Sequence, residues 1–133
     1  MESQEYWSTV CCDDGTMTPD YPFLTWTRLH DEAAMSAGKP LRIANKLKRW
    51  YEQAGFVDVR EEVFKLPVNS WPKDPQFKMI GKFHERSLLD GLQGFSLAYF
   101  SRVLGWTKEE IEVYLVKVRQ AIADRSVHAY HKM

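Results

Sequence analysis

The stretch from Lys39 to Leu66 constrains the fold more than any other part of this 133-residue chain. Its first half has apolar residues at intervals of three and four, which predicts a helix with one wide buried face: Leu41, Ile43, Ala44, Leu47, Trp50, Tyr51 and Ala54. Pro40 suits the first turn of this helix, and Gly55 suits the position just after its last turn. β-Branched and aromatic residues from Phe56 to Leu66 then predict a strand. A helix that leads into a strand through one glycine is typical of α/β proteins.

The same patterns predict the elements on either side of this stretch. Helical spacing occurs from Phe23 to Gly38, from Gln76 to Gly91, from Gly94 to Leu104 and from Lys108 to Ile122. We expect Gly91 and Gly94 to separate two of these helices, and Thr107 with Glu110 to form a capping box that starts the last one. Strand-like composition occurs from Glu2 to Val10 and from Val127 to Met133. The order predicts one α/β domain over residues 1–133, with about three strands and about five helices.

Composition excludes several classes of protein. The chain has 18 basic and 18 acidic residues, so no general electrostatic attraction draws it to nucleic acid or to an anionic membrane. We expect small molecules or proteins as partners instead. No apolar run reaches the roughly 20 residues of a spanning helix, and the first residues do not resemble a signal peptide, which predicts the cytoplasm, with the nucleus as the alternative. Cys11 and Cys12 are adjacent and are expected to be reduced structural thiols.

Motifs of the common enzyme classes are missing from the sequence. It contains no Gly-x-Gly turn for a nucleotide, no P-loop lysine, no HExxH and no G-x-S-x-G. His128 and His131 lie three apart on a predicted strand, so they should face opposite sides, and we predict no metal site. Asp13 and Asp14 are expected to form a turn and to point apart into water.

A few side chains remain as candidates for a site. His84 lies among apolar residues of a predicted helix, where it could act as a general base near neutral pH, although a hydrogen-bonded helix histidine is the ordinary alternative. Tyr99, on the next apolar helix, is the second candidate catalytic residue. Glu5, Trp71 and Phe83 are candidate substrate-binding residues, for which packing, or a solvated carboxylate, is the alternative.

Three segments resemble one protein family: ESQEYWSTVCCDDGT, KPLRIANKLKRWYEQAGFVDVREEVFKLPVNSWPKDP and LLDGLQGFSLAYFSRVLGWTKEEIEVYLVKVRQAIADRSVHAYHKM. They are similar to the C-terminal half of fungal LaeA-like methyltransferases, which are class I S-adenosylmethionine-dependent enzymes associated with secondary metabolism. The resemblance implies a Rossmann-like sheet in which Glu2 to Val10, Phe56 to Leu66 and Val127 to Met133 match the fifth, sixth and seventh strands. The seventh would lie antiparallel between the other two.

The resemblance also implies what the chain lacks. Family members carry the glycine-rich turn and the acidic residue that bind the cofactor in an N-terminal half, which is absent here. We therefore expect a truncated Rossmann-like methyltransferase fold with no cofactor-binding residue of its own. Such a chain would not bind S-adenosylmethionine alone, but would do so if completed by a partner or a longer chain. The part present would shape the acceptor pocket, mainly with the helices from Gln76 to Leu104.

Three functions follow as hypotheses. The first is a methyltransferase-like protein of fungal secondary metabolism that acts on a small natural product. The second is a cofactor-independent enzyme, such as a cyclase or pericyclase, that uses the remaining apolar pocket. The third is a non-catalytic partner subunit. Because the strand from Glu2 to Val10 would lack its neighbour, we expect a homo-oligomer or a protein partner at the open sheet edge.

Overall fold

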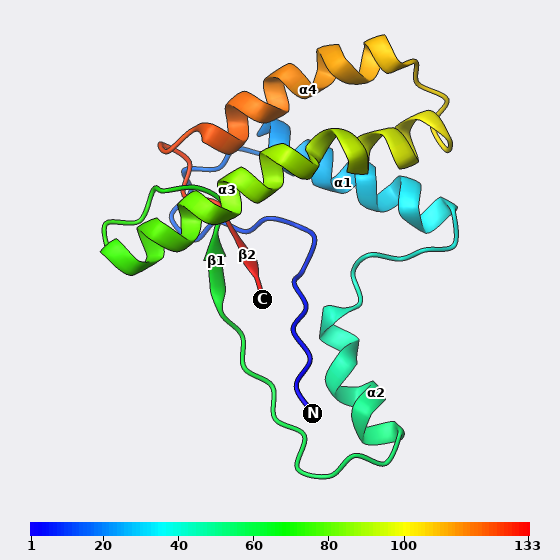
Figure 1. The fold of residues 1–133 in the computed structure, drawn as a ribbon, viewed down its shortest axis with the longest axis vertical. Coiled ribbons are helices and arrows are strands. Elements are labelled where there is room, and N and C mark those ends of the chain that lie inside the picture. The colour runs from blue at the N-terminus through cyan, green and yellow to red at the C-terminus, as the bar shows by residue number, and fades with distance from the viewer.

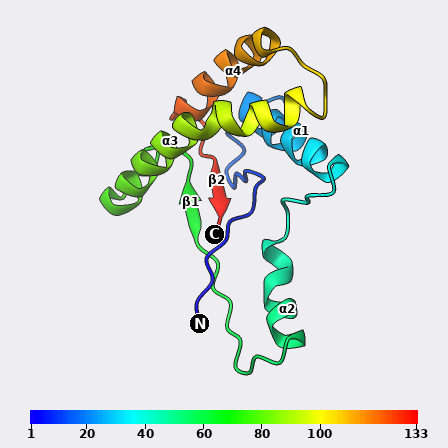
Figure 2. The same cartoon turned by 45° about the vertical axis from the view of Figure 1, so that its right-hand side comes forward.

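The computed structural model describes all 133 residues and shows a helical layer above a small sheet and a lobe that stands apart (Figure 1). Its elements are α1 (Pro22–Ser36), η1 (Ala44–Lys46), α2 (Leu47–Gln53), β1 (Lys65–Pro67), α3 (Pro75–Ser96), η2 (Leu97–Ser101), α4 (Lys108–Ala123) and β2 (Tyr130–Lys132). Helices α1, α3 and α4 pack together, and η2, a short π-helix, contacts both α1 and α4. Helix α2 remains apart from this layer in a second view (Figure 2). None of the helices combines the length and the hydropathy needed to cross a bilayer.

The core lies between α1, α3 and α4. Helix α4 contributes its predicted apolar face, in which Ile111, Leu115, Val118 and Ile122 are fully buried. The predicted capping box is confirmed, because the Glu110 N–H donates to Thr107 Oγ1 at 3.2 Å and the Thr107 N–H donates to Glu110 Oε2 at 2.8 Å. This helix is the element that the sequence predicts best, since both its cap and its periodicity are local signals.

The prediction of two helices separated by Gly91 and Gly94 is wrong. Helix α3 is continuous from Pro75 to Ser96 and runs directly into η2. Neither glycine has a positive φ angle, so neither forms a turn. A glycine inside a helix costs only about 1 kcal/mol, and the packing of α3 on α4 and on η2 offsets that cost. Asp74 caps the start of this helix, and its Oδ1 accepts the N–H groups of Gln76 and Phe77.

The sheet is smaller than predicted. β1 and β2 are antiparallel, with Leu66 opposite His131. On the other side of β2, Cys11 forms a bridge with Tyr130, and the Trp7 N–H donates to the Lys132 carbonyl at 2.7 Å. Segments from the three predicted strands therefore lie side by side, with the C-terminal segment in the middle. Residues 2–10 and 56–64 form no regular strand, because β2 has only three residues and offers a short ladder of hydrogen bonds. The α/β class is confirmed, whereas three strands and five helices become two strands and four α-helices.

The stretch that dominates the sequence argument forms the least buried part of the molecule. We call residues 39–64 the α2 lobe; no residue in it is buried, and α2 has only seven residues. The predicted helix face is only half-buried. Its partly covered positions are Leu41, Ile43, Ala44, Leu47 and Tyr51, whereas Trp50 and Ala54 are exposed. The apolar spacing is real, but full burial needs a second surface, which the rest of the chain supplies only in part.

Candidate functional site

An open groove of about 980 Å³ lies between the N-terminal residues, α2 and residues 56–64. Glu5, a predicted substrate-binding residue, lies along it together with the aromatic rings of Tyr51 and Phe56. Its carboxylate makes only a local contact, accepting the N–H of Tyr6 at 3.0 Å. Glu5 is exposed, as the alternative of a solvated carboxylate expected.

A smaller cavity of about 250 Å³ lies beside the proline-rich loop and contains Trp71. The indole ring stacks on His128 with centroids 4.7 Å apart, and its Nε1 donates to the Ala129 carbonyl at 2.9 Å. Phe77 of α3 and Tyr130 of β2 complete the aromatic part of the wall. Trp71 therefore both lines a cavity and ties the loop to the C-terminal segment.

Two carboxylates of the smaller cavity correct a prediction. Asp14 forms the expected turn, with its Oδ1 accepting the Thr16 N–H at 3.1 Å, but neither Asp13 nor Asp14 simply points into water. The pKa of Asp14 is lowered by hydrogen bonds, chiefly the one with His128 and then those with Thr16. The pKa of Asp13 is lowered in the same way, chiefly by Lys65 and then by Tyr130. Because each carboxylate already has its partners, we interpret this cluster as a clamp between the turn and the sheet.

His84 is half-buried and pairs with the buried His131. Its Nε2 is 2.9 Å from Nδ1 of His131, which is 1% exposed and packs edge-on against Phe23 and Tyr6. The backbone of Ser8 lies close to the His131 ring and acts to raise the pKa of His131, against the larger effect of burial. When both rings are neutral, one of the two facing nitrogens carries the proton and donates it to the other.

Burial shapes the charge of this pair. Desolvation lowers the pKa of His84 to about 4, and desolvation, followed by repulsion from His84, lowers the pKa of His131 as well. Both rings are therefore neutral at pH 7. This is the hydrogen-bonded alternative that the sequence argument named for His84. His128 lies two residues before β2 rather than in a strand, and it lines the smaller cavity, away from the His84–His131 pair.

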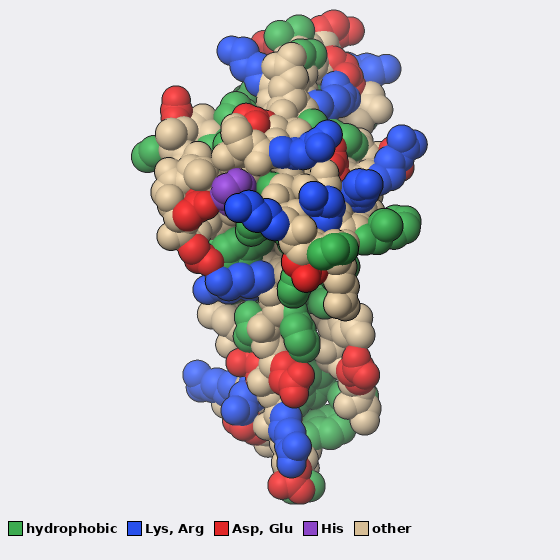
Figure 3. All heavy atoms as spheres, turned by 90° about the vertical axis from the view of Figure 1, so that its left-hand side faces the viewer, with side chains coloured by type: hydrophobic (Ala, Val, Ile, Leu, Met, Phe, Trp, Pro, Cys, Tyr) green, Lys and Arg blue, Asp and Glu red, His purple; other side chains and the backbone are tan.

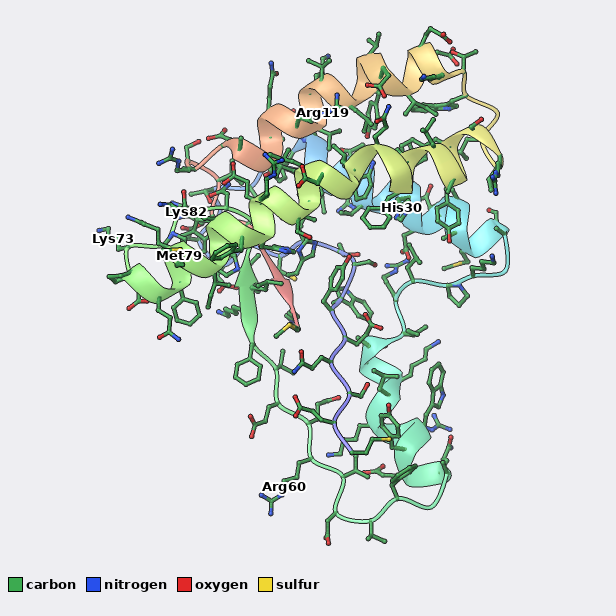
Figure 4. All side chains as sticks on the ribbon, viewed as in Figure 1. His30, Arg60, Lys73, Met79, Lys82 and Arg119 are labelled. Atoms are coloured by element: carbon green, nitrogen blue, oxygen red, sulfur yellow. The ribbon has the colours of Figure 1, made fainter.

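Tyr99 lies in an aromatic cluster around His30, a residue that the sequence argument missed. The side chain of His30 belongs to α1 (Figure 4). The His30 ring stacks on Trp26 at 4.9 Å and meets Tyr99 edge-on at 4.8 Å, with Phe95 and Phe100 at 6.4 Å. It is 9% exposed, and its Nε2 has no hydrogen-bond partner. Burial lowers the pKa of His30, so the ring is neutral at pH 7 and its Nε2 is free to bind a polar group.

The next residue of α1 is also buried and polar. Asp31 is 2% exposed and forms an ion pair with Arg42, while its Oδ1 has no partner. Helical spacing could have found these residues, since His30 lies seven positions after Phe23 and four after Trp26 on the apolar face of α1. Polar residues on such a face indicate either a satisfied core or a site.

The structure does not gather the predicted site residues. His84 and Tyr99 are 15 positions apart along α3 and η2, which corresponds to roughly 20 Å at about 1.5 Å per residue. Phe83 is 72% exposed and lines neither of the two cavities. Glu5 and Trp71 line different cavities.

The glycines offer no fit for a nucleoside cofactor. Positive φ angles occur at Gly15, Gly38, Gly55 and Gly105, and none of these glycines lies directly between a strand and the first turn of a helix. A nucleoside-binding turn needs that position, because the backbone must approach the ligand at the helix N-terminus. We derive no cofactor-dependent step from these residues.

Known proteins similar to this chain are fungal. The probable methyltransferase tdiE of Emericella nidulans is 32% identical over 98% of the chain and 41% of its own length. The secondary metabolism regulator LAE1 of Cochliobolus heterostrophus is 31% identical over 92% of the chain and 40% of its own length. The protein-methionine methyltransferase laeA of Chaetomium globosum is 30% identical over 89% of the chain and 37% of its own length.

These matches confirm the resemblance to LaeA-like methyltransferases. The chain spans about two fifths of the length of the curated relatives it matches. No family model matches the sequence, and no solved structure matches it.

Proposed function

Because this chain is similar to a segment of fungal LaeA-like methyltransferases, we propose that it forms the acceptor-side portion of a methyltransferase of secondary metabolism. S-Adenosylmethionine would be held by a portion outside these 133 residues, on the same polypeptide or on another chain. The acceptor would be a small natural product.

One observation carries this proposal. Almost the whole chain, 98% of it, aligns with a methyltransferase, yet it accounts for only 41% of that enzyme. The glycine positions described above agree, because none of them fits a nucleoside-binding turn. Methyl transfer needs an aligned and dehydrated acceptor rather than a protein nucleophile, so the lack of a catalytic triad is no objection.

We assign the acceptor side to the junction of α3, η2 and α1. π-Helical segments such as η2 occur frequently at functional sites, and this one contains Tyr99. His30 beside it has a buried, unpartnered Nε2 within an aromatic surround, a combination suited to orienting one polar group of an otherwise apolar molecule. The roles of Glu5, Trp71, Phe83 and His84 remain predictions.

A partner at the open sheet edge is part of the proposal. Among residues 2–10, only Trp7 donates a backbone hydrogen bond to another backbone group, and that bond goes to β2. The opposite edge of this segment is thus available for a strand of the cofactor-binding portion.

Isothermal titration of S-adenosylmethionine tests the proposal. The 133-residue chain alone should give no binding heat, whereas the chain mixed with the remaining part of a relative such as tdiE should bind saturably. Full-length tdiE serves as the positive control. Saturable binding by the chain alone would contradict the proposal that S-adenosylmethionine is held by a portion outside these 133 residues. Failure of the mixture to bind, while the control binds, would count against the acceptor-side role.

Variants of the complemented enzyme then test the site. Tyr99→Phe and His30→Gln should raise KM for the acceptor while leaving the dissociation constant for S-adenosylmethionine unchanged. Lys117→Glu, an exposed change on α4, is the control. No specific observation favours the cofactor-independent cyclase, since His84 and Tyr99 do not meet at one cavity.

A further inference from the structure

The α2 lobe carries apolar surface that the described chain leaves uncovered. Large hydrophobic side chains are exposed throughout it: Trp50 by 45%, Phe56 by 49%, Val57 by 85%, Val63 by 61% and Phe64 by 56%. Hydrophobic side chains lie among acidic and basic ones over the lower part of the molecule (Figure 3). A seven-residue helix is too short to be stable without tertiary packing. The lobe therefore needs a second surface against it.

The charges of the lobe indicate which surface this is. Residues 44–53 carry Lys46, Lys48 and Arg49 with one acidic residue, a net charge of +2. Residues 56–64 carry three acidic residues and Arg60, a net charge of −2. None of these charged side chains takes part in an ion pair of the structure. Lys48 on α2 and Asp58, Glu61 and Glu62 on the opposite wall line the groove, and none of them has an ion-pair partner.

We propose that the α2 lobe is a self-complementary interface that binds a second copy of this chain. A two-fold axis would place the basic wall of each copy against the acidic wall of the other, as an isologous dimer requires. The exposed rings and valines between the walls would become the buried centre, with the charges at the rim. One chain supplies both signs, so a second copy matches the lobe without any further partner.

Sedimentation velocity over about a hundredfold range of chain concentration tests this interface. A monomer–dimer equilibrium is expected, and higher salt should weaken it because rim charges are screened. A monomer at every concentration would overturn the proposal.

Charge reversals identify the surface. Lys48→Glu and Glu62→Lys, both along the groove, should each weaken the dimer by about tenfold or more, because like charges would then meet twice across the axis. An equimolar mixture of the two variants should dimerise as well as the unchanged chain, since both charge pairs are restored between different chains. A charge pair restored within a single chain cannot explain recovery in the mixture, because each variant carries only one of the two reversals. Lys117→Glu on α4 is the matched control and should have no effect.

A matched valine pair tests the apolar centre. Val63→Ser should weaken the dimer by about tenfold, whereas Val113→Ser on α4, at a valine that is 73% exposed, should not. All of these side chains lie outside the core between α1, α3 and α4, so each variant should lose at most the small far-ultraviolet circular dichroism signal of the seven-residue helix α2. A dimer that is indifferent to the lobe variants would place the contact at another surface, such as the open sheet edge, and would overturn the proposal. Failure of the complementation assay with tdiE would leave this result untouched, because the dimer does not depend on the methyltransferase role.

Discussion

Replacing Gly81 by alanine should destabilise the protein, although alanine is the better helix former. Gly81 is buried where α3 crosses the loop that follows β1. A Cβ atom at this position would lie 2.0 Å from the Asn69 carbonyl oxygen and 2.6 Å from its carbon. Real Cβ atoms essentially never approach closer than 3.0 Å, so helix and loop would have to separate by about 1 Å.

That separation is expensive because Asn69 cannot move freely. It is fully buried, and its Nδ2 donates to the carbonyls of Ile122 and Asp124 while its Oδ1 accepts the Trp71 N–H. Overpacking of this kind costs about 3 kcal/mol at the upper end of the usual range. Alanine recovers about 1 kcal/mol of helix propensity. We expect a net loss of about 2 kcal/mol.

Gly94 supplies the matched control on the same helix. A Cβ there meets nothing within 4 Å, so Gly94→Ala should stabilise the protein by about 1 kcal/mol. Urea unfolding followed by circular dichroism measures both values, with equal m-values required for the comparison. The two variants should differ by about 3 kcal/mol with opposite signs. A Gly81→Ala protein as stable as the unchanged chain would refute the close approach of α3 to the loop.

Three further predictions concern stability. Burial lowers the pKa values of His84 and His131 from 6.5, so the unfolded chain binds protons that the folded chain does not. The urea midpoint should therefore stay constant above pH 6.5 and fall as the pH drops toward about 4. The double variant His84→Leu with His131→Phe should lose this pH dependence. Asn69→Ala leaves buried backbone groups without partners and should cost about 3 kcal/mol, seen as a lower urea midpoint; an unchanged midpoint would contradict the network. Thr107→Ala should cost about 1 kcal/mol by thermal unfolding, and Thr107→Ser, which keeps the capping oxygen, should restore most of it.

Local signals predicted the helices that begin and end within their own sequence. The spacing in α1 and α4 and the capping box at Thr107 all operate within one or two turns, so no distant contact is needed to read them. The continuity of α3 was missed because the cost of two glycines is small beside the packing energy, and packing is invisible in a local window.

The candidate site was harder to predict. The bond between His84 and His131 joins residues 47 positions apart, and the cluster around His30 joins α1 to η2. A side chain's neighbours across such distances depend on where helices cross, which the periodicity of one helix does not specify. Only the burial of His30 could have been read from the sequence, through its place on the apolar face of α1.

The sequence by itself determined the α/β class, the α1 and α4 helices and the resemblance to LaeA-like methyltransferases. The tertiary structure alone decided which of the apolar faces is buried. Spacing specifies that apolar residues between positions 41 and 54 share a face, but burial requires a complementary surface, and the chain covers that face only in part. The same physical difference separates a helix, whose hydrogen bonds are local, from a strand, whose ladder must be completed by a neighbour.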